Sequence, residues 1–429
     1  MYKLPWGTTD NQGGWVEVTD QCNMSCPGCY RQRMEGDKPL EQVKNEILRC
    51  KKVTNCDLMV IAGGEPLIYP HIVEVVEYID SLGLKPLMLT NGTLLTEKLA
   101  LKLKNAGLKR IHFHVDGRQE REGWLGKNEN KLNELRQVYA DKIWKLKGIQ
   151  CGFHIMVGKE TMEHIPGIMS WYRNNMHKVQ HLSFIALSGL PVIPSMGYFC
   201  NGTEIREKEL VNGYVNLSDI SITTKEILET IQNAYPDYVP SAYLNGDAYP
   251  EKNKQLFIVN IGTSKGFLGV LGARSMELTQ AFYHLFHGRY YSFAPDPAIG
   301  KKVFILALFD KQMQKTLKRF LECLIKDPLT LFKKVYLQSM IIQQPIDFIG
   351  SQKNACDHCV NPMIFNDMVI NPCELDEYRL YGNTITAEKM MIREQPLAKV
   401  SGTLVTEPVE LDQSTSLDPF VGGEGTEVR

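Results

Sequence analysis

The chain has 429 residues, 43% hydrophobic and 23% charged, which is typical of a globular protein with a sizeable core. Its 48 lysines and arginines nearly balance 49 acidic residues, so its charge does not favour nucleic acid as a partner. The start of the chain does not resemble a signal peptide, and the longest strongly apolar run, 303–309, is too short to span a membrane. Eleven cysteines then favour metal binding in a reducing compartment over a disulfide framework. We therefore expect a cytoplasmic protein.

From residue 14 to about 186, short apolar runs alternate with amphipathic segments of helical length. The predicted strands are 15–19, 58–62, 85–89, 110–115, 152–157 and 182–187. The predicted helices lie near 39–52, 70–82, 95–106, 130–146 and 161–176. Apolar strands joined by helices predict an α/β fold with a parallel sheet, here an open, partial (β/α)6 barrel. Functional loops in such folds follow the carboxyl ends of the strands.

The regular alternation stops after this first part of the chain. We expect residues 1–187 to form the barrel core and residues 188–345 to form an α+β region that shapes a substrate pocket. Residues 346–385 contain a second group of cysteines, which predicts a small auxiliary domain. Residues 386–429 are acidic and poor in aromatic side chains, which predicts a disordered tail.

Cys22, Cys26 and Cys29 form a CX3CX2C motif directly after the first predicted strand. A tetrahedral zinc site would want a fourth ligand, whereas three soft thiolates suit a 4Fe–4S cluster that keeps one iron open. Structural cysteines on a loop are the remaining alternative.

Polar or glycine-rich motifs follow the next three predicted strands. They are Gly63-Gly64-Glu65-Pro66, then Thr90-Asn91-Gly92, then His114 and Asp116. Glycines at a strand end let the backbone approach a ligand closely, and Glu65 can accept a hydrogen bond from a cation. Each motif can also be an ordinary turn between a strand and a helix.

The CX3CX2C and GGEP motifs, in this order and at these places, resemble the radical S-adenosylmethionine (radical SAM) superfamily over roughly the first 200 residues. The resemblance implies that Cys22, Cys26 and Cys29 hold a 4Fe–4S cluster. It further implies reductive cleavage of S-adenosylmethionine to a deoxyadenosyl radical, which abstracts hydrogen from a substrate, with electrons supplied by a flavodoxin or ferredoxin. The residues that it implies for S-adenosylmethionine are Tyr30, Gly63, Gly64, Glu65, Pro66, Asn91, His114 and Asp116. Two positions depart from the family pattern, Gly28 where an aromatic residue is usual and His114 in place of a serine.

Cys356, Cys359 and Cys373 form a CX2CX13C motif. It resembles the C-terminal cluster motif of the radical SAM enzymes that begin molybdenum-cofactor synthesis, the GTP cyclase family, and more generally SPASM or Twitch domains. The resemblance implies a second, auxiliary 4Fe–4S cluster; a structural zinc site is the alternative. Candidates for a fourth ligand are His358, Cys323 and Cys200. The segment 364–372 predicts a β-hairpin that returns Cys373 to the other two cysteines.

The substrate is the least determined part of the sequence interpretation. Segment 301–345 contains a basic amphipathic helix, which can contact an anionic membrane or a lipid, or can simply pack on the core with a solvated basic face. The first predicted strand begins near residue 15, which disfavours an N-terminal peptide-recognition domain. We therefore favour a small-molecule substrate such as a cofactor precursor, a sugar nucleotide or a lipid. The alternatives are a maturase that modifies ribosomally made peptides and a non-catalytic iron–sulfur or zinc protein.

Overall fold

The computed structural model describes residues 1–27, 29, 31, 35–187, 196–206, 222–349 and 351–389. Residues Met1–Met390 form one compact unit. Tyr30 and most of the predicted acidic tail lie outside the described residues, so the predictions made for them stay predictions.

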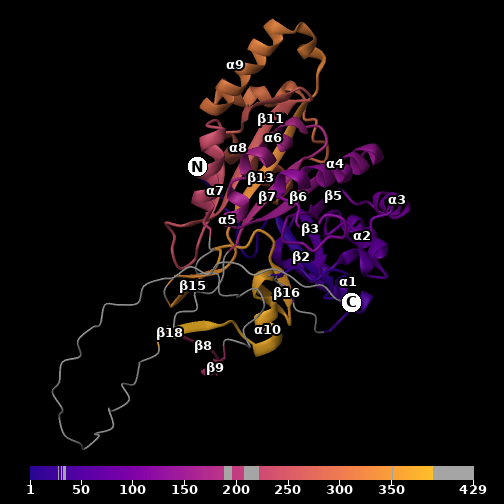
Figure 1. The fold of residues 1–429 in the computed structure, drawn as a ribbon, viewed down its shortest axis with the longest axis vertical. Coiled ribbons are helices and arrows are strands. Elements are labelled where there is room, and N and C mark those ends of the chain that lie inside the picture. Colours follow the sequence, from indigo (N-terminus) through magenta and orange to yellow (C-terminus); the bar gives the residue numbers. More distant parts are fainter. Residues whose placement is uncertain are drawn as a thin grey trace, which may run out of the picture. The chain divides into compact units, whose positions relative to one another are not determined.

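The six predicted strands are all present and lie side by side as parallel neighbours in one sheet (Figure 1). In chain order they are β2 (Gly13–Thr19), β3 (Leu58–Gly63), β4 (Lys85–Thr90), β5 (Arg110–His114), β6 (Gln150–Val157) and β7 (His181–Ala186). The prediction of a parallel α/β core is therefore confirmed, because strands with nearly continuous apolar sequence are buried on both faces.

Helices connect these strands as predicted, with the fifth predicted helix divided in two. They are α1 (Leu40–Thr54), η1 (Pro66–Ile68), α2 (Ile72–Ser81), α3 (Glu97–Asn105), α4 (Glu129–Leu146), α5 (Lys159–Met162) and α6 (Ile165–Asn174). Local sequence fixes where several begin: the Thr96 side chain accepts from the Leu99 amide before α3, and Asn128 accepts from the Lys131 amide before α4.

Part of the predicted α+β region, residues 188–345, continues the same sheet. Strand β13 pairs in parallel with β7, and β11 then pairs antiparallel with β13. The elements beyond β7 are β8 (Met196–Cys200), β9 (Thr203–Ile205), α7 (Thr224–Ala234), β10 (Ala242–Asn245), β11 (Asn253–Thr263), β12 (Gly266–Val270), α8 (Ala273–His287), η3 (Lys301–Leu308), α9 (Lys311–Lys326), η4 (Pro328–Phe332) and β13 (Val335–Gln343). At the chain's start, β1 (Tyr2–Lys3) pairs in parallel with β10.

The C-terminal cysteine-rich segment docks on the other edge of the sheet. Its elements are β14 (Asp347–Ile349), β15 (Gln352–Asn354), β16 (Met363–Phe365), β17 (Met368–Ile370), η5 (Pro372–Glu374), α10 (Leu375–Tyr381) and β18 (Thr386–Lys389). The predicted hairpin is confirmed as β16 and β17, and Met363 pairs with Trp15 of β2. Strand β18 pairs with β8, so residues 386–389 belong to the folded unit and not to the acidic tail.

The two faces of the parallel sheet differ in what covers them. On one face, side chains such as Ile111, Phe113 and Phe153 pack with the apolar sides of the connecting helices. On the other face, Leu58, Val60 and Leu87 form a separate cluster with Phe293, which follows α8. Because strand residues alternate between faces, this inner face also receives the polar residues of β5, β6 and β7. Among the described residues, no helix combines the length and apolarity needed to cross a bilayer.

Candidate active site

The first cysteine motif begins where β2 ends, and the backbone just before Cys22 is held by the GGEP segment. The Gly64 amide donates to the Thr19 carbonyl and the Glu65 amide to the Gln21 carbonyl, both at 2.8 Å. A Cβ at Gly63 would lie 2.1 Å from the Thr19 oxygen, and one at Gly64 would lie 2.2 Å from the Gln21 oxygen. Both glycines are therefore required by this close approach, which fixes where the cysteine loop starts.

The three thiols of this loop lie close enough to influence one another. Burial raises the pKa of Cys26 to about 12, and the neighbouring Cys29 and Cys22 add to the rise. Burial also raises the pKa of Cys29, with Cys22 contributing. A bound metal would have to displace these protons, because thiolates are the ligands.

The thiols are nevertheless too widely spread for one ion. Among the described residues, the only histidine, cysteine or acidic groups with three ligand atoms mutually within 4.8 Å are three histidines in the barrel. A tetrahedral zinc with bonds of about 2.3 Å brings its sulfurs to about 3.8 Å of each other. A cluster in which each thiolate binds a different iron needs wider spacing between its sulfurs than a single ion does.

Glu65 connects the ends of two neighbouring strands, and its predicted contact with S-adenosylmethionine stays a prediction. Its side chain is fully buried, and its two oxygens accept from the Leu67 amide at 3.0 Å, the Thr90 hydroxyl at 2.5 Å and the Asn91 amide at 2.7 Å. Burial nevertheless raises the pKa of this carboxyl above its usual value. Glu65 therefore joins the ends of β3 and β4 and is already supplied with donors.

Asn91 connects the ends of β3 and β4 to the cysteine loop. Its side-chain amide donates to the Asn23 side chain at 2.8 Å and approaches the Cys22 sulfur at 3.9 Å. The predicted TNG turn thus lies beside the first cysteine, as expected for motifs that follow neighbouring parallel strands.

His114 and Asp116, predicted at the end of the fourth strand, contact each other directly. The His114 Nε2 lies 2.6 Å from the Asp116 carboxylate, which also accepts from the amides of Met156 and Arg118. Burial alone would raise the pKa of Asp116, but the charge and hydrogen bond of His114 outweigh it and lower this pKa. Arg121, which the sequence did not single out, donates to the carbonyls of Asn91 and His114 and so joins the ends of β4 and β5.

The second group of cysteines also comes together in space. Cys356 and Cys359 lie on the loop after β15, and the hairpin brings Cys373 back to them at η5. Burial raises the pKa of Cys373, and Cys356 contributes; the pKa of Cys359 rises from burial and from Cys373 and Cys356. Like the first group, the three sulfurs are not all within 4.8 Å of one another.

The three candidates for a fourth auxiliary ligand differ in their surroundings. The Cys200 thiol donates to the carbonyls of Tyr381 and Asn383, and Cys323 is exposed on α9. His358 follows Asp357, whose side chain accepts from the His358 amide. All eleven cysteines are free thiols.

One buried arginine links the two cysteine groups. Arg31, two residues after Cys29, donates to Glu17 at 2.6 Å and to the Pro372 carbonyl at 2.5 Å, next to Cys373. The Asp376 carboxylate lies 3.6 Å from the same guanidinium. No sequence pattern indicates this connection, because Arg31 lies more than 300 positions before Pro372 and Asp376.

A cavity of about 660 Å³ lies on the inner face of the sheet. Its wall is mostly apolar, with Val60, Leu89 and Phe257 among the lining residues, and its polar lining includes Arg110 and a group of three histidines. Val360 and Asn361, which directly follow Cys359, also line it. The cavity therefore reaches the auxiliary cysteine loop.

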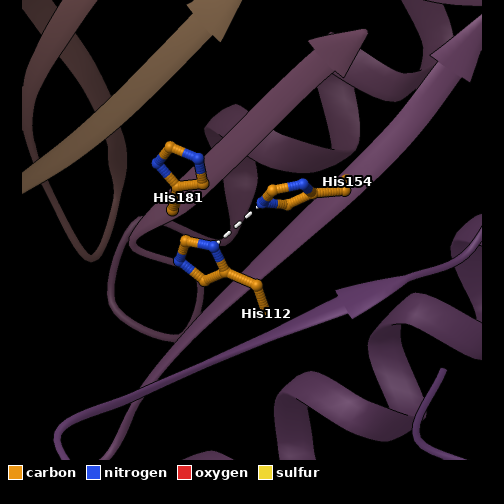
Figure 2. A group of neighbouring side chains, drawn as sticks. All are labelled: His112, His154 and His181. Atoms are coloured by element: carbon orange, nitrogen blue, oxygen red, sulfur yellow. Dashed lines mark hydrogen bonds between the residues drawn. The ribbon is translucent and has the colours of Figure 1, made fainter. Parts of the chain in front are cut away.

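The three histidines, His112, His154 and His181, come from β5, β6 and β7 and face one another inside the barrel (Figure 2). The His112 Nδ1 and His154 Nε2 are 2.9 Å apart, and the rings of His112 and His181 are stacked with centroids 4.4 Å apart and planes within 1°. Stacked, parallel rings cannot both place a nitrogen lone pair on one ion, since each lone pair lies in its own ring plane. Burial lowers the pKa of all three imidazoles, that of His154 to about 3, so they are neutral.

Arg110 is the one cavity residue whose charge is left without an acidic partner among the described residues. Its side chain lies 3.8 Å from the Phe293 ring centroid and donates through Nε and Nη2 to the Gln150 side-chain oxygen. No carboxylate lies within 4.0 Å of it in the described part of the chain, and burial lowers its pKa to about 9. A buried cation of this kind favours an anionic ligand.

Of the sequence-predicted residues, the structure brings together the cysteine loop, Gly63 to Pro66 and Asn91, and it places His114 and Asp116 at the neighbouring strand end. The histidine group and Arg110 were missed. The alternation of HFH in β5 and GFH in β6 was the available signal, since it puts these residues on the inner face.

Comparison with known proteins shows what the first part of the chain is similar to. Residues 16–172 match the family model of the radical SAM superfamily. A probable GTP 3',8-cyclase of Methanothermobacter marburgensis is 39% identical over 105 residues, 24% of this chain and 34% of the relative. An AdoMet-dependent heme synthase of Methanosarcina barkeri is 31% identical over 105 residues, 24% of this chain and 30% of the relative.

Longer but weaker similarities extend further along the chain. A 7,8-dihydro-6-hydroxymethylpterin dimethyltransferase of Methanocaldococcus jannaschii is 25% identical over 244 residues, 53% of this chain and 44% of the relative. Among solved structures, anSMEcpe with bound AdoMet gives a TM-score of 0.38 at 17% identity, covering 53% of this chain and 58% of that one. The chain thus spans less than half of the length of each of these three curated relatives.

Proposed function

Because the chain carries a radical SAM domain, the domain of an enzyme superfamily, over residues 16–172, we propose that it cleaves S-adenosylmethionine and uses the resulting radical on a small molecule held in the barrel cavity. The observation that carries this proposal is the position of the cysteine loop. Three soft thiols begin directly after a backbone segment held by Gly63 and Gly64, beside the ends of β3 and β4.

Cys22, Cys26 and Cys29 would hold the 4Fe–4S cluster. When bound, such a cluster with one open iron supplies the electron that splits S-adenosylmethionine into methionine and a deoxyadenosyl radical. Glu65 holds the ends of β3 and β4 together, and Asn91 positions the loop at Cys22. Asp116, fixed by His114 and two backbone amides, offers a carboxylate for the ribose hydroxyls of S-adenosylmethionine.

The cavity supports the small-molecule interpretation. His154 lines it and is the register partner of His114, so the cavity comes within one strand position of the site proposed for S-adenosylmethionine. Its wall is mostly apolar, and Arg110 provides one unpaired cation. We therefore propose a substrate with an apolar body and an acidic group, a carboxylate or a phosphate, that binds to Arg110. The relatives named for heme and for a pterin support a small-molecule substrate over a peptide.

Deoxyadenosine release is the test of the reaction. Protein reconstituted with iron and sulfide under anaerobic conditions should release deoxyadenosine from S-adenosylmethionine when reduced with dithionite. Cys26→Ala should release none, whereas Cys323→Ser, which removes an exposed thiol outside both groups, should behave like the wild type. A loaded wild-type protein that releases no deoxyadenosine would favour a non-catalytic iron–sulfur protein.

The auxiliary group is tested by metal content. A Cys22→Ala, Cys26→Ala, Cys29→Ala triple variant should retain about four irons per chain at Cys356, Cys359 and Cys373. Zinc in place of iron in this variant would refute an auxiliary cluster.

The substrate class is tested with two simple probes, octanoate and hexyl phosphate. Each should raise the Tm of the wild-type protein, because an anion on Arg110 relieves a buried, unpaired charge. In Arg110→Met the shift should disappear, and the ligand-free variant should be at least as stable as the wild type. Equal shifts in both proteins would remove Arg110 from the proposed site.

A further inference from the structure

Exposed large apolar side chains are concentrated in the elements that follow β12, and two of them line the cavity. The described part of the chain has 20 large hydrophobic side chains that are exposed, and 11 of them fall between residues 282 and 332. They are Phe282, Leu285, Phe286, Ile305, Leu308, Phe309, Leu321, Ile325, Leu329, Leu331 and Phe332. Phe286, Ile325 and Phe332 are 75%, 83% and 81% exposed. We call these 11 residues the apolar face. Soluble monomers rarely expose so many large apolar residues in one region.

The elements that carry the apolar face are packed on one another. Helix α9 contacts both η3 and η4, and the rings of Phe304 and Phe320 join η3 to α9 with centroids 4.8 Å apart. Phe282 and Phe286 of α8 line the same cavity as Val303 and Leu306 of η3. Figure 1 shows α8 and α9 near β11, at the end of the sheet away from β2. The exposed residues therefore form one region.

The same region is rich in unpaired positive charge. Residues 301–334 contain nine lysines and arginines and three acidic residues, in a chain whose net charge is −1. Two of the acidic residues are engaged within the fold: Asp327 pairs with Lys265 and Lys333, and Asp310 caps α9. Seven lysines have no acidic group within 4.0 Å in the described residues, namely Lys301, Lys302, Lys311, Lys315, Lys318, Lys326 and Lys334. Exposed apolar side chains bordered by free lysines match the chemistry of an anionic bilayer surface.

The cavity connects the apolar face to the proposed substrate site. Phe282 and Phe286 are more than half exposed and also line the cavity, so the cavity opens within the apolar face. A molecule that leaves a bilayer beneath this face would pass from lipid into a mostly apolar cavity without crossing water. This is the least costly route for an amphipathic molecule with a long apolar part.

We propose that the apolar face docks the protein on an anionic membrane surface and that the substrate is a membrane-resident amphiphile taken up through the cavity mouth. The docking rests on surface chemistry alone, whereas the statement about the substrate rests on the function proposed above. The basic segment 301–345 is thus a membrane-binding surface. Its helix α9 uses Met313, Thr316 and Phe320 for the core and leaves Leu321 and Ile325 outward.

Vesicle sedimentation tests the docking directly. The full-length, iron-loaded protein, without S-adenosylmethionine or reductant, is mixed with vesicles of phosphatidylcholine containing 30% phosphatidylglycerol or with phosphatidylcholine alone. We expect sedimentation with the anionic vesicles, weakened by 0.5 M salt, and little with the neutral ones. A Phe286→Glu, Ile325→Glu double variant should bind about tenfold or more weakly. Leu125→Glu, at an exposed residue outside the apolar face, should bind like the wild type.

Three results would overturn the proposal. One is a wild-type protein that stays in the supernatant with both kinds of vesicle, and another is Leu125→Glu losing as much binding as the double variant. A stable dimer in the absence of vesicles that Phe286→Glu, Ile325→Glu converts to a monomer would assign the face to a second copy of the chain. Unchanged visible absorption and circular dichroism of the double variant exclude loss of the fold as the cause. Because no turnover is involved, vesicle binding without deoxyadenosine release would refute the proposed reaction and leave the docking intact.

Discussion

Arg31 offers the sharpest test of how the two cysteine groups are held together. Its side chain, like those of Glu17 and Asp376, is at most 4% exposed, and its guanidinium contacts both carboxylates. Arg31→Met keeps most of the volume but removes the cation that pairs with the buried Glu17 carboxylate, whereas Asp376 keeps its contact with Arg379 at 3.3 Å. Removing one partner of a buried ion pair costs about 3–5 kcal/mol. For a unit the size of Met1–Met390, this corresponds to a drop in Tm of about 5 °C.

The assay is thermal unfolding of the metal-free proteins under reducing conditions, so that differences in cluster loading do not affect the measured Tm. Arg118→Met is the matched control, because Arg118 pairs with Glu160 at 2.9 Å on the surface and should cost at most about 1 kcal/mol. Adding Glu17→Gln to Arg31→Met should restore part of the loss, since the carboxylate that pairs with Arg31 is then neutral. A loss for Arg31→Met no larger than that for Arg118→Met would refute the reasoning.

Two further predictions concern the inner face of the sheet and the end of β5. A Cβ at Gly152 would lie 2.4 Å from His112 Cδ2 and 2.8 Å from His181 Cβ, so Gly152→Ala should destabilise the protein by about 1–3 kcal/mol, as measured by urea unfolding. Gly7→Ala is the control, because nothing lies within 4 Å of its Cβ; equal effects of the two would show that the histidines are not packed against Gly152. The pKa of Asp116 is lowered in the folded protein, so its ionised form stabilises the fold at pH values above the usual pKa of 3.8. This contribution is lost as the pH falls further, through the folded-state pKa. The stability difference between the wild type and Asp116→Asn should therefore shrink below about pH 3.8, and a difference that grows there would contradict the ion pair with His114.

The sequence allowed the local part of the fold to be predicted because its signals are local. The six parallel strands and the helices between them follow from apolar periodicity, and the hairpin of β16 and β17 follows from a short turn between apolar runs. In that turn Asn366 and Asp367 adopt left-handed backbone angles, which these residue types tolerate better than most.

Features that depend on distant partners were not predicted. Strand β13 joins the sheet through pairing with β7, about 150 residues earlier in the chain, and no local pattern distinguishes it from a strand of a separate domain. The roles of Arg31 and Arg110 could not be predicted, because each depends on side chains that are distant in the sequence. For the same reason the sequence did not predict the three hydrogen bonds by which Glu65 joins the ends of β3 and β4.

The most direct test of the central claim is the electron paramagnetic resonance spectrum of the anaerobically reduced protein before and after addition of S-adenosylmethionine. We predict that the cofactor changes the spectrum of the wild type and of the Cys356→Ala, Cys359→Ala, Cys373→Ala triple variant. It should change nothing in the Cys22→Ala, Cys26→Ala, Cys29→Ala variant. A wild-type spectrum that does not respond, or a response that survives loss of the first three cysteines, would contradict an open iron at the N-terminal loop.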